Sequence, residues 1–448
     1  MEDILILGVG VSPYKNDGVL RFEHFCTRFG LPYRILGDGK VWKGGDMFAG
    51  TGGGQKVNEI LIALEEIENK LIIICDTFDL FPLASKSEII EKFNNLCSND
   101  QILFSSEVYC WPDTSLASSY PETTNKYRFL NSGSFIGYRD NIYNLIKHSI
   151  IKDNDDDQLY YTQKYLSGEK IILDHDCHLF QALNGCKKDI VVHRNRVYNK
   201  YTNSYPIFVH GNGPAKVFLN QIENHLITDL HLNYSFTSIS KIINEPRIFF
   251  ALYINSSVNS KIESFLKHVS AINYHNKYVK VYDSHNNQQI KNLIELIGFC
   301  YQPNTGHYVY NDFIQSNAEY YFLLEQSCII TKRDIFDELI PLCNMYQRII
   351  SPLLCHQKNP DITNVSAQES FCKQSEDYQD IIKYHKRGIW NVPYLSSALL
   401  IKGDIIRNWN LSKENKFSSI NSLGLCYNLK KYTLFMYLVN YNVYGFLN

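Results

Sequence analysis

The chain has 448 residues, of which 45% are hydrophobic and 14% aromatic, and its 44 basic and 46 acidic residues nearly cancel. This length and composition are typical of a globular protein with two or three domains. The small net charge excludes strong electrostatic attraction to nucleic acid or to an anionic membrane, so we expect neither as a partner. The twelve cysteines include no CxxC pair, and a zinc site is therefore not expected.

The first elements alternate between strand and helix patterns. Residues 4–9 predict a strand, residues 19–29 a helix with one apolar face, and residues 33–36 a second strand. An amphipathic helix is expected after Gln55, and strands are expected at 101–105, 133–138 and 206–210. This alternation predicts a mostly parallel sheet that is covered on both faces.

Two acidic residues follow a very apolar run. Residues 71–75 read LIIIC and predict a buried strand, after which come Asp76 and Asp79. Ligands collect at the carboxyl ends of strands in open α/β sheets, so two carboxylates there indicate a divalent cation that holds a phosphorylated substrate. The alternative is a helix cap or a turn, which explains one acid more readily than two.

Glycines are dense between residues 37 and 54, in the runs WKGGD and TGGGQK. Adjacent glycines let backbone N–H groups approach an anion, and Lys56 can pair with a phosphate or a carboxylate. Trp42 suggests a stacking role in the same segment. The spacing matches neither a P-loop nor the dinucleotide fingerprint, and a flexible surface loop is the alternative interpretation.

Two further segments carry candidate residues. The run DNDDDQ, Asp153 to Gln158, leads into a predicted helix, and acids at a helix N-terminus could bind sugar hydroxyls or orient an acceptor. A solvated acidic turn is the alternative. In FLNSGSFIGY, Asn131 to Gly133 are interpreted as a turn of small residues, either close to another group or simply a tight β-turn.

The run VHGNGPAK places His210 at the end of another apolar strand. Neutral imidazole is a suitable ligand for Mn²⁺, and the amides of Gly211 and Gly213 together with Lys216 could grip a diphosphate. A lone histidine is more often structural. Beside the paired acids, however, His210 is a candidate third metal ligand.

The regular pattern fades between residues 222 and 246, and the apolar run RIFFALYI then begins a new strand. We therefore expect two domains, residues 1–230 and 245–448. The second half repeats the first in outline, with a helix at 258–270, strands at 279–282 and 320–324, and a helix after residue 286, which indicates an internal duplication of fold.

The strand ends of the two halves differ. Where the first half has its paired acids, the second has Glu325, Gln326 and Ser327. The second domain is therefore expected to lack the metal.

The chain resembles the glycosyltransferase domain of the procollagen lysyl hydroxylases, enzymes that place sugars on collagen hydroxylysine. The runs that carry the resemblance, in order, are WKGGD, GGGQKV, CDTFD, LFSSEVYCWPD, RFLNSGSFIGY, DDDQLYYT, LDHDCHLFQALNG and VHGNGPAK. The similarity continues into that family's accessory domain, notably at residues 375–404. It covers most of the chain.

This resemblance implies an α/β fold of two Rossmann-like, GT-A-type domains in tandem, the first catalytic and the second a non-catalytic accessory domain. It also implies Mn²⁺ held by Asp76, Asp79 and His210, with a UDP-sugar as donor. The residues assigned to donor binding are Val9, Gly10, Trp42, Asp46, Lys56, Phe78, Gly211, Gly213 and Lys216. The residues assigned to the sugar site and the acceptor are Trp111, Asn131, Asp156 and Asp157.

The implied reaction is transfer of glucose from UDP-glucose to galactosyl-hydroxylysine of collagen or a collagen-like protein, with retention at the anomeric carbon. The alternatives are glucosyl or galactosyl transfer directly to hydroxylysine, hydrolysis of a UDP-sugar, and a non-catalytic UDP-sugar-binding module. Because the chain ends where the family's iron and 2-oxoglutarate domain would follow, we expect glycosylation without hydroxylation.

The amino terminus and the composition suggest where the protein works. The first residues are acidic and glycine-interrupted, unlike a secretory signal, and no stretch approaches the roughly 20 apolar residues of a membrane span. We therefore expect a cytoplasmic protein. This location and an AT-rich bias hint at a large virus that makes its own collagen-like protein, in which case the host cytoplasm is the expected location. A homodimer is a further hypothesis.

Overall fold

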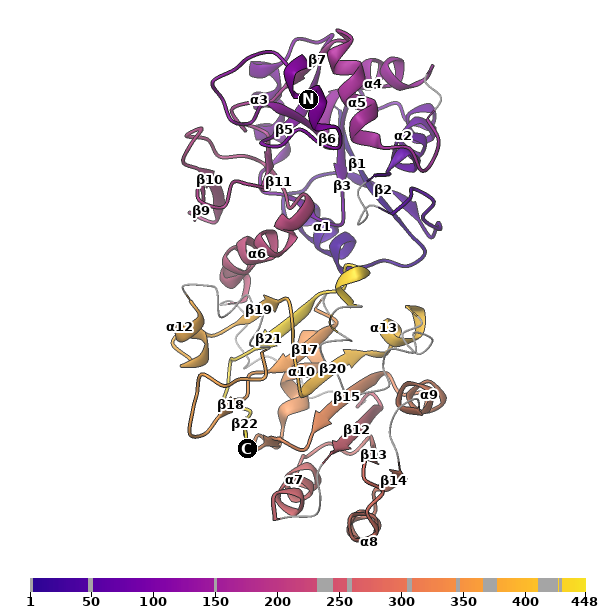
Figure 1. Cartoon of the computed structure of the whole chain (residues 1–448), viewed down its shortest axis with the longest axis vertical. Coiled ribbons are helices and arrows are strands. Elements are labelled where there is room, and N and C mark those ends of the chain that lie inside the picture. The colour runs from indigo at the N-terminus through magenta and orange to yellow at the C-terminus, as the bar shows by residue number, and fades with distance from the viewer. Residues whose placement is uncertain are drawn as a thin grey trace. The chain divides into compact units, whose positions relative to one another are not determined.

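The computed structural model describes residues 3–46, 51–148, 151–231, 245–255, 260–303, 308–343, 347–365, 377–409, 426 and 429–448. The chain divides into two compact units, Met1–Leu226 and Ile227–Asn448 (Figure 1). Both units are α/β, as predicted. Every helix among the described residues is too short or too polar to cross a membrane. The eleven described cysteines are not in disulfides.

The first unit contains six helices and two short 3₁₀ segments among its described residues. Its elements, in chain order, are β1 (Ile4–Ser12), α1 (Asp17–Arg28), β2 (Tyr33–Asp38), α2 (Gly54–Glu66), β3 (Leu71–Asp76), β4 (Leu80–Pro82), α3 (Lys86–Leu96), β5 (Ile102–Glu107), η1 (Thr114–Ser119), β6 (Phe129–Tyr138), α4 (Arg139–Ile146), α5 (Asp157–Leu166), β7 (Ile171–Leu173), β8 (Phe180–Ala182), β9 (Ile190–His193), β10 (Arg196–Asn199), β11 (Phe208–His210), η2 (Gly213–Ala215) and α6 (Lys216–His231).

The main sheet of this unit has the strand order β2-β1-β3-β6-β5-β7. Strands β2, β1 and β3 are parallel, whereas β6 runs antiparallel to both of its neighbours. A second sheet, β4-β11-β8, begins directly after β3. The carboxyl end of β3 therefore lies where the two sheets meet.

Strand β3 is buried on both faces, as its continuous apolar run predicts. Ile72 and Ile74 point into a cluster that includes Val57 and Ile60 of α2. Leu71, Ile73 and Cys75 point into a second cluster that includes apolar residues of α1 and α3. The alternation of side chains along the strand thus anchors it between helices on opposite faces of the sheet.

Strand β6 carries a bulge that the sequence did not predict. On its β5 side, Phe135 pairs with Phe104, but the next pair is Asn131 with Ser105, so three residues of β6 have no β5 partner. The small residues at 131–133, interpreted from sequence as a turn, therefore lie inside a strand. Bulges bend a strand and redirect its side chains, and they are common beside functional sites.

The second unit is built in the same way. Its described elements are β12 (Ile248–Ile254), α7 (Ser260–Ser270), β13 (Lys277–Asp283), α8 (Gln288–Ile297), β14 (Cys300–Pro303), α9 (Tyr308–Gln315), β15 (Tyr320–Glu325), β16 (Cys328–Ile330), α10 (Ile335–Cys343), β17 (Ile349–Pro352), β18 (Cys355–His356), α12 (Tyr378–Ile382), β19 (Ile389–Val392), β20 (Ala398–Lys402), α13 (Gly403–Asn408), β21 (Met436–Val439) and β22 (Gly445–Leu447).

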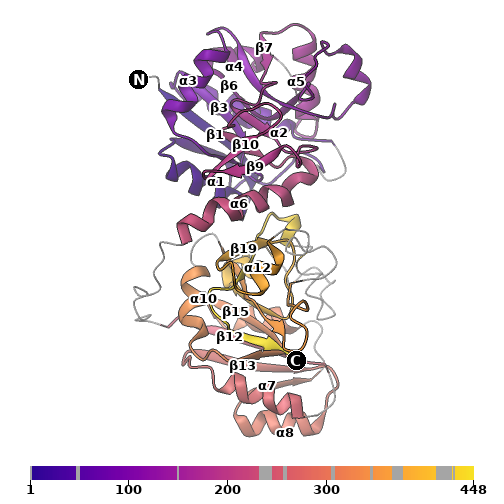
Figure 2. The same cartoon turned by 90° about the vertical axis from the view of Figure 1, so that its left-hand side faces the viewer.

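The large sheet of the second unit has the order β14-β13-β12-β15-β20-β17-β21-β19, and α7 and α8 lie near β13 (Figure 2). Strands β13, β12 and β15 are parallel, and β20 is antiparallel to both β15 and β17. The run β13-β12-β15-β20-β17 thus repeats the order and directions of β2-β1-β3-β6-β5. The predicted fold class, two α/β domains of similar architecture in tandem, is confirmed.

Candidate metal and donor site

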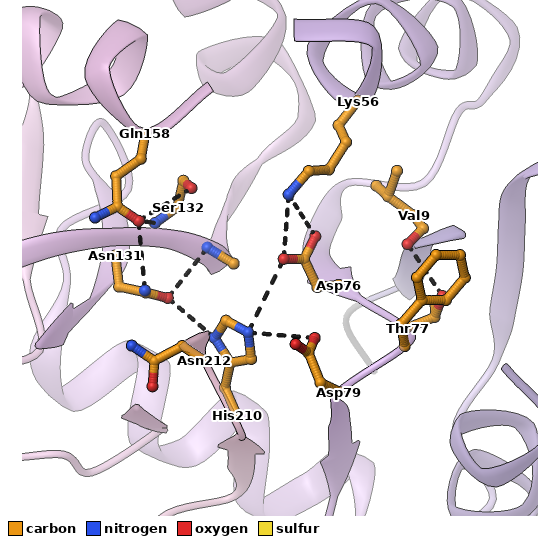
Figure 3. A network of polar contacts seen from close by, with 12 residues as sticks. Val9, Lys56, Asp76, Thr77, Asp79, Asn131, Ser132, Gln158, His210 and Asn212 are labelled. Carbon is orange, nitrogen blue, oxygen red and sulfur yellow. Dashed lines mark hydrogen bonds and ion pairs between the residues drawn. The ribbon is translucent and has the colours of Figure 1, made fainter. Parts of the chain in front are cut away.

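Three ligand side chains converge at the carboxyl end of β3. Asp76 is the last residue of β3, Asp79 immediately precedes β4, and His210 is the last residue of β11. Because β11 pairs with β4 so that His210 faces Leu80, the imidazole is brought next to Asp79. One ligand atom from each of the three side chains lies within 4.8 Å of the other two (Figure 3).

The imidazole of His210 is held in a defined orientation. Its Nε2 lies 3.4 Å from Asp79 Oδ1 and 4.0 Å from Asp76 Oδ2, while its Nδ1 lies 3.1 Å from Asn131 Oδ1. Asn131 Nδ2 donates to Glu107 Oε1, which turns the amide oxygen of Asn131 toward the histidine. We therefore assign the Nδ1–H donor to the Asn131 contact, which directs Nε2 toward the two carboxylates.

Gly133 provides the space for this ring. A Cβ atom built on Gly133 would lie 2.2 Å from His210 Cε1 and 2.6 Å from Nδ1. The bulge in β6 therefore places both the amide that orients the imidazole and the glycine against which the imidazole packs.

Two lysines bind the acidic side chains. Lys56 Nζ lies 3.0 Å from Asp76 Oδ1 and 3.0 Å from Asp157 Oδ2, so it bridges β3 and the first turn of α5. Lys216, at the start of α6, lies 3.1 Å from Asp79 Oδ2. Sequence reasoning assigned both lysines to the donor; the structure places each beside a candidate metal ligand.

Burial and these neighbours set the protonation equilibria. Burial raises the pKa of Asp76, and Lys56 and His210 offset only part of that rise. Burial acts in the same direction on Asp79, but Lys216 and His210 outweigh it and hold its pKa well below the usual value. For His210, burial lowers the pKa, but Asp79 more than compensates, so the net pKa is raised.

A buried carboxylate beside this cluster was missed by the sequence analysis. Glu107, at the end of β5, is 3% exposed and accepts hydrogen bonds from Asn131, Gln158 and Asn212 at 2.8–2.9 Å. Burial raises its pKa, while the hydrogen bonds from Asn131 and Gln158 lower it. The only signal for Glu107 in the sequence is an acidic residue at the end of the strand segment ILFSSE. Its hydrogen-bond partners are distant in sequence.

The acidic run at 153–158 is divided between two roles. Asp156 caps α5, accepting from Leu159 N at 2.7 Å. Asp157 points instead to Lys56 and accepts from Ser132 Oγ at 3.2 Å. The solvated-turn interpretation therefore does not describe Asp157, which is buried and joined to Asp76 through a shared lysine.

The other residues assigned to the donor from sequence are distributed around this cluster. Val9 and Gly10 lie in β1, where the Val9 carbonyl accepts from Thr77 Oγ1 at 3.0 Å, and Phe78 is half-buried in the segment between β3 and β4. Trp42 is half-buried and its Nε1 donates to Gly45 O at 2.7 Å, whereas Asp46 is exposed. Residues 47–50 of the glycine-rich segment lie outside the described part of the chain.

The remaining assigned residues lie on either side of His210. The Gly211 amide donates to the Asp79 carbonyl at 2.8 Å, so it fixes the loop rather than facing a ligand. Gly213 has a positive φ of 57° and begins η2. Trp111 is about half exposed, and its carbonyl accepts from Gln158 Nε2 at 3.2 Å. Through Gln158, Trp111 is therefore linked to Glu107 and Asn131.

The donor set of the cluster suits a divalent cation such as Mn²⁺. Two carboxylates and an imidazole are the ligands that first-row metals bind at about 2.0–2.2 Å, which requires ligand atoms within roughly 4.5 Å of one another. The ligand atoms offered by Asp76, Asp79 and His210 lie within 4.8 Å of one another, a few tenths of an ångström wider than this spacing, which small side-chain rotations close. The adjacent Lys56 and Lys216 would supply positive charge to an anion bound beside such a cation.

Comparison with known proteins places this site in a family. A family model described as the PLOD GT domain matches residues 2–234. The chain is 47% identical over 451 aligned positions to "Uncharacterized protein R699" of Acanthamoeba polyphaga mimivirus, covering 100% of this chain and 98% of that protein.

Animal proteins are more distant. The chain is 29% identical to "Multifunctional procollagen lysine hydroxylase and glycosyltransferase LH3" of Homo sapiens, covering 99% of this chain and 65% of LH3. It is 28% identical to "Procollagen-lysine,2-oxoglutarate 5-dioxygenase 2" of the same organism, of which it spans 64%.

Solved structures with partial similarity include S. aureus TarS (residues 1–349), at 10% identity, a TM-score of 0.34 and coverage of 45% of this chain and 60% of that chain. They also include the mannosyltransferase PcManGT from Pyrobaculum calidifontis in complex with GDP-Man and Mn²⁺, at 9% identity, a TM-score of 0.31 and coverage of 51% and 67%. The resemblance drawn from the sequence motifs is confirmed by the family match: the chain belongs to the PLOD GT domain family of glycosyltransferases.

Proposed function

We propose that the first domain, expected from the sequence at residues 1–230, transfers glucose from UDP-glucose to galactosyl-hydroxylysine of collagen or a collagen-like protein, with Mn²⁺ as cofactor. The observation that carries the proposal is the convergence of Asp76, Asp79 and His210 at a strand end in a chain of this family. The name of the LH3 relative supports the choice of acceptor. Residues 245–448 are proposed as a non-catalytic accessory domain.

The residues of the site have different proposed roles, which follow from their positions. Asp76, Asp79 and His210 would hold the cation, which neutralises the charge that develops on the departing diphosphate. Asn131 fixes the His210 ring, and Lys56 and Lys216 supply positive charge beside the same carboxylates.

The acceptor side is proposed to involve the acidic helix start and its neighbours. Asp157 and Ser132 lie on the α5 side of the cluster, and Trp111 lies next to Gln158. We propose that Asp156 and Asp157 orient the acceptor hydroxyl and that Trp111 and Asn131 line the sugar site. Retention of configuration is part of the proposal because donor and product are both α-linked.

One experiment separates this function from its alternatives. UDP release is measured with UDP-glucose and UDP-galactose, with and without Mn²⁺, in the presence of water alone, a hydroxylysine peptide, or a galactosyl-hydroxylysine peptide. The proposal expects Mn²⁺-dependent release from UDP-glucose that the galactosylated peptide stimulates well above the water background. Stimulation by the hydroxylysine peptide alone would assign direct transfer instead. Release without any acceptor effect would assign a hydrolase.

A binding measurement on the same protein separates the enzyme from a non-catalytic binding module. Calorimetric titration of UDP with Mn²⁺ that shows tight binding, combined with no turnover of any donor, would assign a non-catalytic UDP-sugar-binding protein. The location in the cytoplasm, a viral source and a homodimer remain parts of the proposal that cell fractionation, genome context and sedimentation would test.

A further inference from the structure

The loop after β5 exposes two large aromatic side chains beside the site. Tyr109 is 52% exposed and Trp111 is 48% exposed, whereas Glu107, at the start of the same loop, is buried. Aromatic residues are enriched where proteins bind partners, because they combine a large apolar surface with few rotatable bonds. Tyr109 therefore stands out as a candidate contact residue to which no role has been assigned, and it lies beside Trp111, which is assigned to the sugar site.

Trp111 is attached to the polar network of the site, and Tyr109 lies two residues before it in the same loop. The Trp111 carbonyl accepts from Gln158 Nε2, and the same nitrogen donates to Glu107 Oε1 at 2.8 Å. On the other side, the Asn184 amide donates to Asn212 Oδ1, and Asn212 Nδ2 donates to Glu107 Oε2. Gln158 thus fixes the loop at the Trp111 carbonyl, while Asn212 links Glu107 to the segment that carries Asn184.

Gly185, next to Asn184, provides the seat for the Tyr109 ring. A Cβ atom built on Gly185 would lie 2.8 Å from Tyr109 Cε2 and 3.0 Å from its hydroxyl oxygen. The ring thus lies against bare backbone while about half of the residue remains accessible. A ring supported in this way is already ordered, so binding a partner costs little additional side-chain entropy.

We propose that Tyr109, together with Trp111, binds the peptide strand of the acceptor. This inference rests on the proposed function, in which the acceptor is a collagen-like chain with a polyproline II backbone. Exposed aromatic side chains are the usual docking surface for polyproline II segments, whose rigid backbone loses little entropy on binding. A lysine side chain must reach from that strand to the metal cluster, and the loop after β5 adjoins the cluster.

The test compares peptide and single-residue acceptors in Tyr109→Ala, with Tyr109→Phe as the conservative variant. Ile62→Ala is the matched control, because Ile62 is also 49% exposed but lies on α2. For a Gly-X-Y peptide that carries galactosyl-hydroxylysine, Tyr109→Ala is expected to raise the acceptor KM about tenfold, which corresponds to about 1.4 kcal/mol. Transfer to free galactosyl-hydroxylysine and the KM for UDP-glucose should stay unchanged. Tyr109→Phe and Ile62→Ala should resemble the native protein.

The outcomes are distinguishable from one another. If the peptide and the free amino acid lose activity equally, the ring acts on the reacting sugar and the inference is overturned. A change in the KM for UDP-glucose would also overturn it, because the effect would then be structural. Should the native protein transfer to no acceptor, the proposed function fails. The inference is then judged by titrating an unmodified (Gly-Pro-Pro)-type peptide, where weaker binding to Tyr109→Ala supports it, and equal or absent binding contradicts it.

Discussion

Two strand ends occupy matching places in the two units and carry different side chains. In the first unit β3 ends at Asp76, and Asp79 follows before β4. In the second, β15 ends at Glu325, and Gln326 and Ser327 precede β16. The strands have the same neighbours in the same directions, so the difference lies in side chains and not in architecture.

The third ligand position differs in the same way. In the first unit β11 pairs antiparallel with β4 and places His210 opposite Leu80. In the second unit β22 pairs antiparallel with β16, and Leu447 stands opposite Cys328. Among the described residues, only the group of Asp76, Asp79 and His210 has the spacing to hold a metal ion. The same scaffold therefore persists with or without the candidate metal ligands, so the fold alone does not report function.

The largest expected effect comes from removing a ligand of the first unit. Asp79→Asn keeps the size of the side chain but removes the charge that faces His210 and Lys216. We expect sugar transfer to fall by about 10³-fold, because the cation no longer stabilises the developing diphosphate charge. Initial rates of UDP release measure this, and an unchanged circular dichroism spectrum shows that the fold is kept. Activity within tenfold of native would refute the metal assignment.

A second expected effect concerns stability. Lys56→Met leaves Asp76 and Asp157 facing each other without their shared cation, and both are largely shielded from solvent. The free energy of unfolding of the first unit should fall by about 3 kcal/mol, and Mn²⁺ should restore part of the loss by replacing the positive charge.

The control for this variant is Lys15→Met, since the Lys15 side chain is 43% exposed and pairs with Glu23 alone, whereas the Lys56 side chain is 11% exposed and bridges two carboxylates. It should cost less than about 1 kcal/mol. Denaturant melts with and without Mn²⁺ measure both variants. Equal losses in unfolding free energy would show that the bridge made by Lys56 stabilises the protein no more than the pair made by Lys15.

A smaller effect is expected from filling the space beside the His210 ring, which Gly133 leaves open. In Gly133→Ala the added Cβ displaces the imidazole, because it would lie 2.2 Å from Cε1. Mn²⁺ affinity should fall by about 10- to 100-fold, the range seen when groups that orient metal ligands are altered. Gly137→Ala, in the same strand, is the matched control, because an added Cβ there would come no closer than 3.1 Å to its nearest neighbour, Ile102. Calorimetric titration with Mn²⁺ measures both affinities. Equal affinities in the two variants would contradict the proposal that Gly133 provides the space for the His210 ring.

The smallest effect should come from the second unit. Glu325→Gln removes the carboxylate that stands where Asp76 stands in the first unit. Burial already raises the pKa of Glu325, and the described residues around it supply no second acid for a metal. We expect transfer and Mn²⁺ binding to stay within about twofold of native. A clear loss of transfer or of Mn²⁺ binding would mean that the end of β15 also contributes to the activity.

The sequence predicted those parts of the site that follow from local pattern. Asp76 and Asp79 were visible because an apolar run ended in acids, and His210 because a strand ended before a glycine turn. Lys56 was singled out, but its bridge to Asp157 depends on the packing of α2 against α5, which no local pattern encodes.

Other features depended on tertiary structure and were missed. Glu107 reads as an ordinary strand residue until Asn131, Gln158 and Asn212 are brought to it from other parts of the chain. The bulge in β6 was read as a turn because small residues favour both. Alternation predicted a mostly parallel sheet, whereas the order and the register of its strands became known only from the pairing of particular strands.

The bulge in β6 has a practical meaning for anyone who redesigns this protein. It separates a single strand into one half that secures the sheet, from Phe135 onward, and another that carries Asn131 to the cluster. The intervening residues have no β5 partner, but Ser134 pairs with Cys75 of β3 and Gly133 packs against His210, so their number is fixed by contacts on the other side of the strand. A redesign should therefore keep the length of this segment, because inserting or deleting one residue there would move the amide and the glycine that position the imidazole.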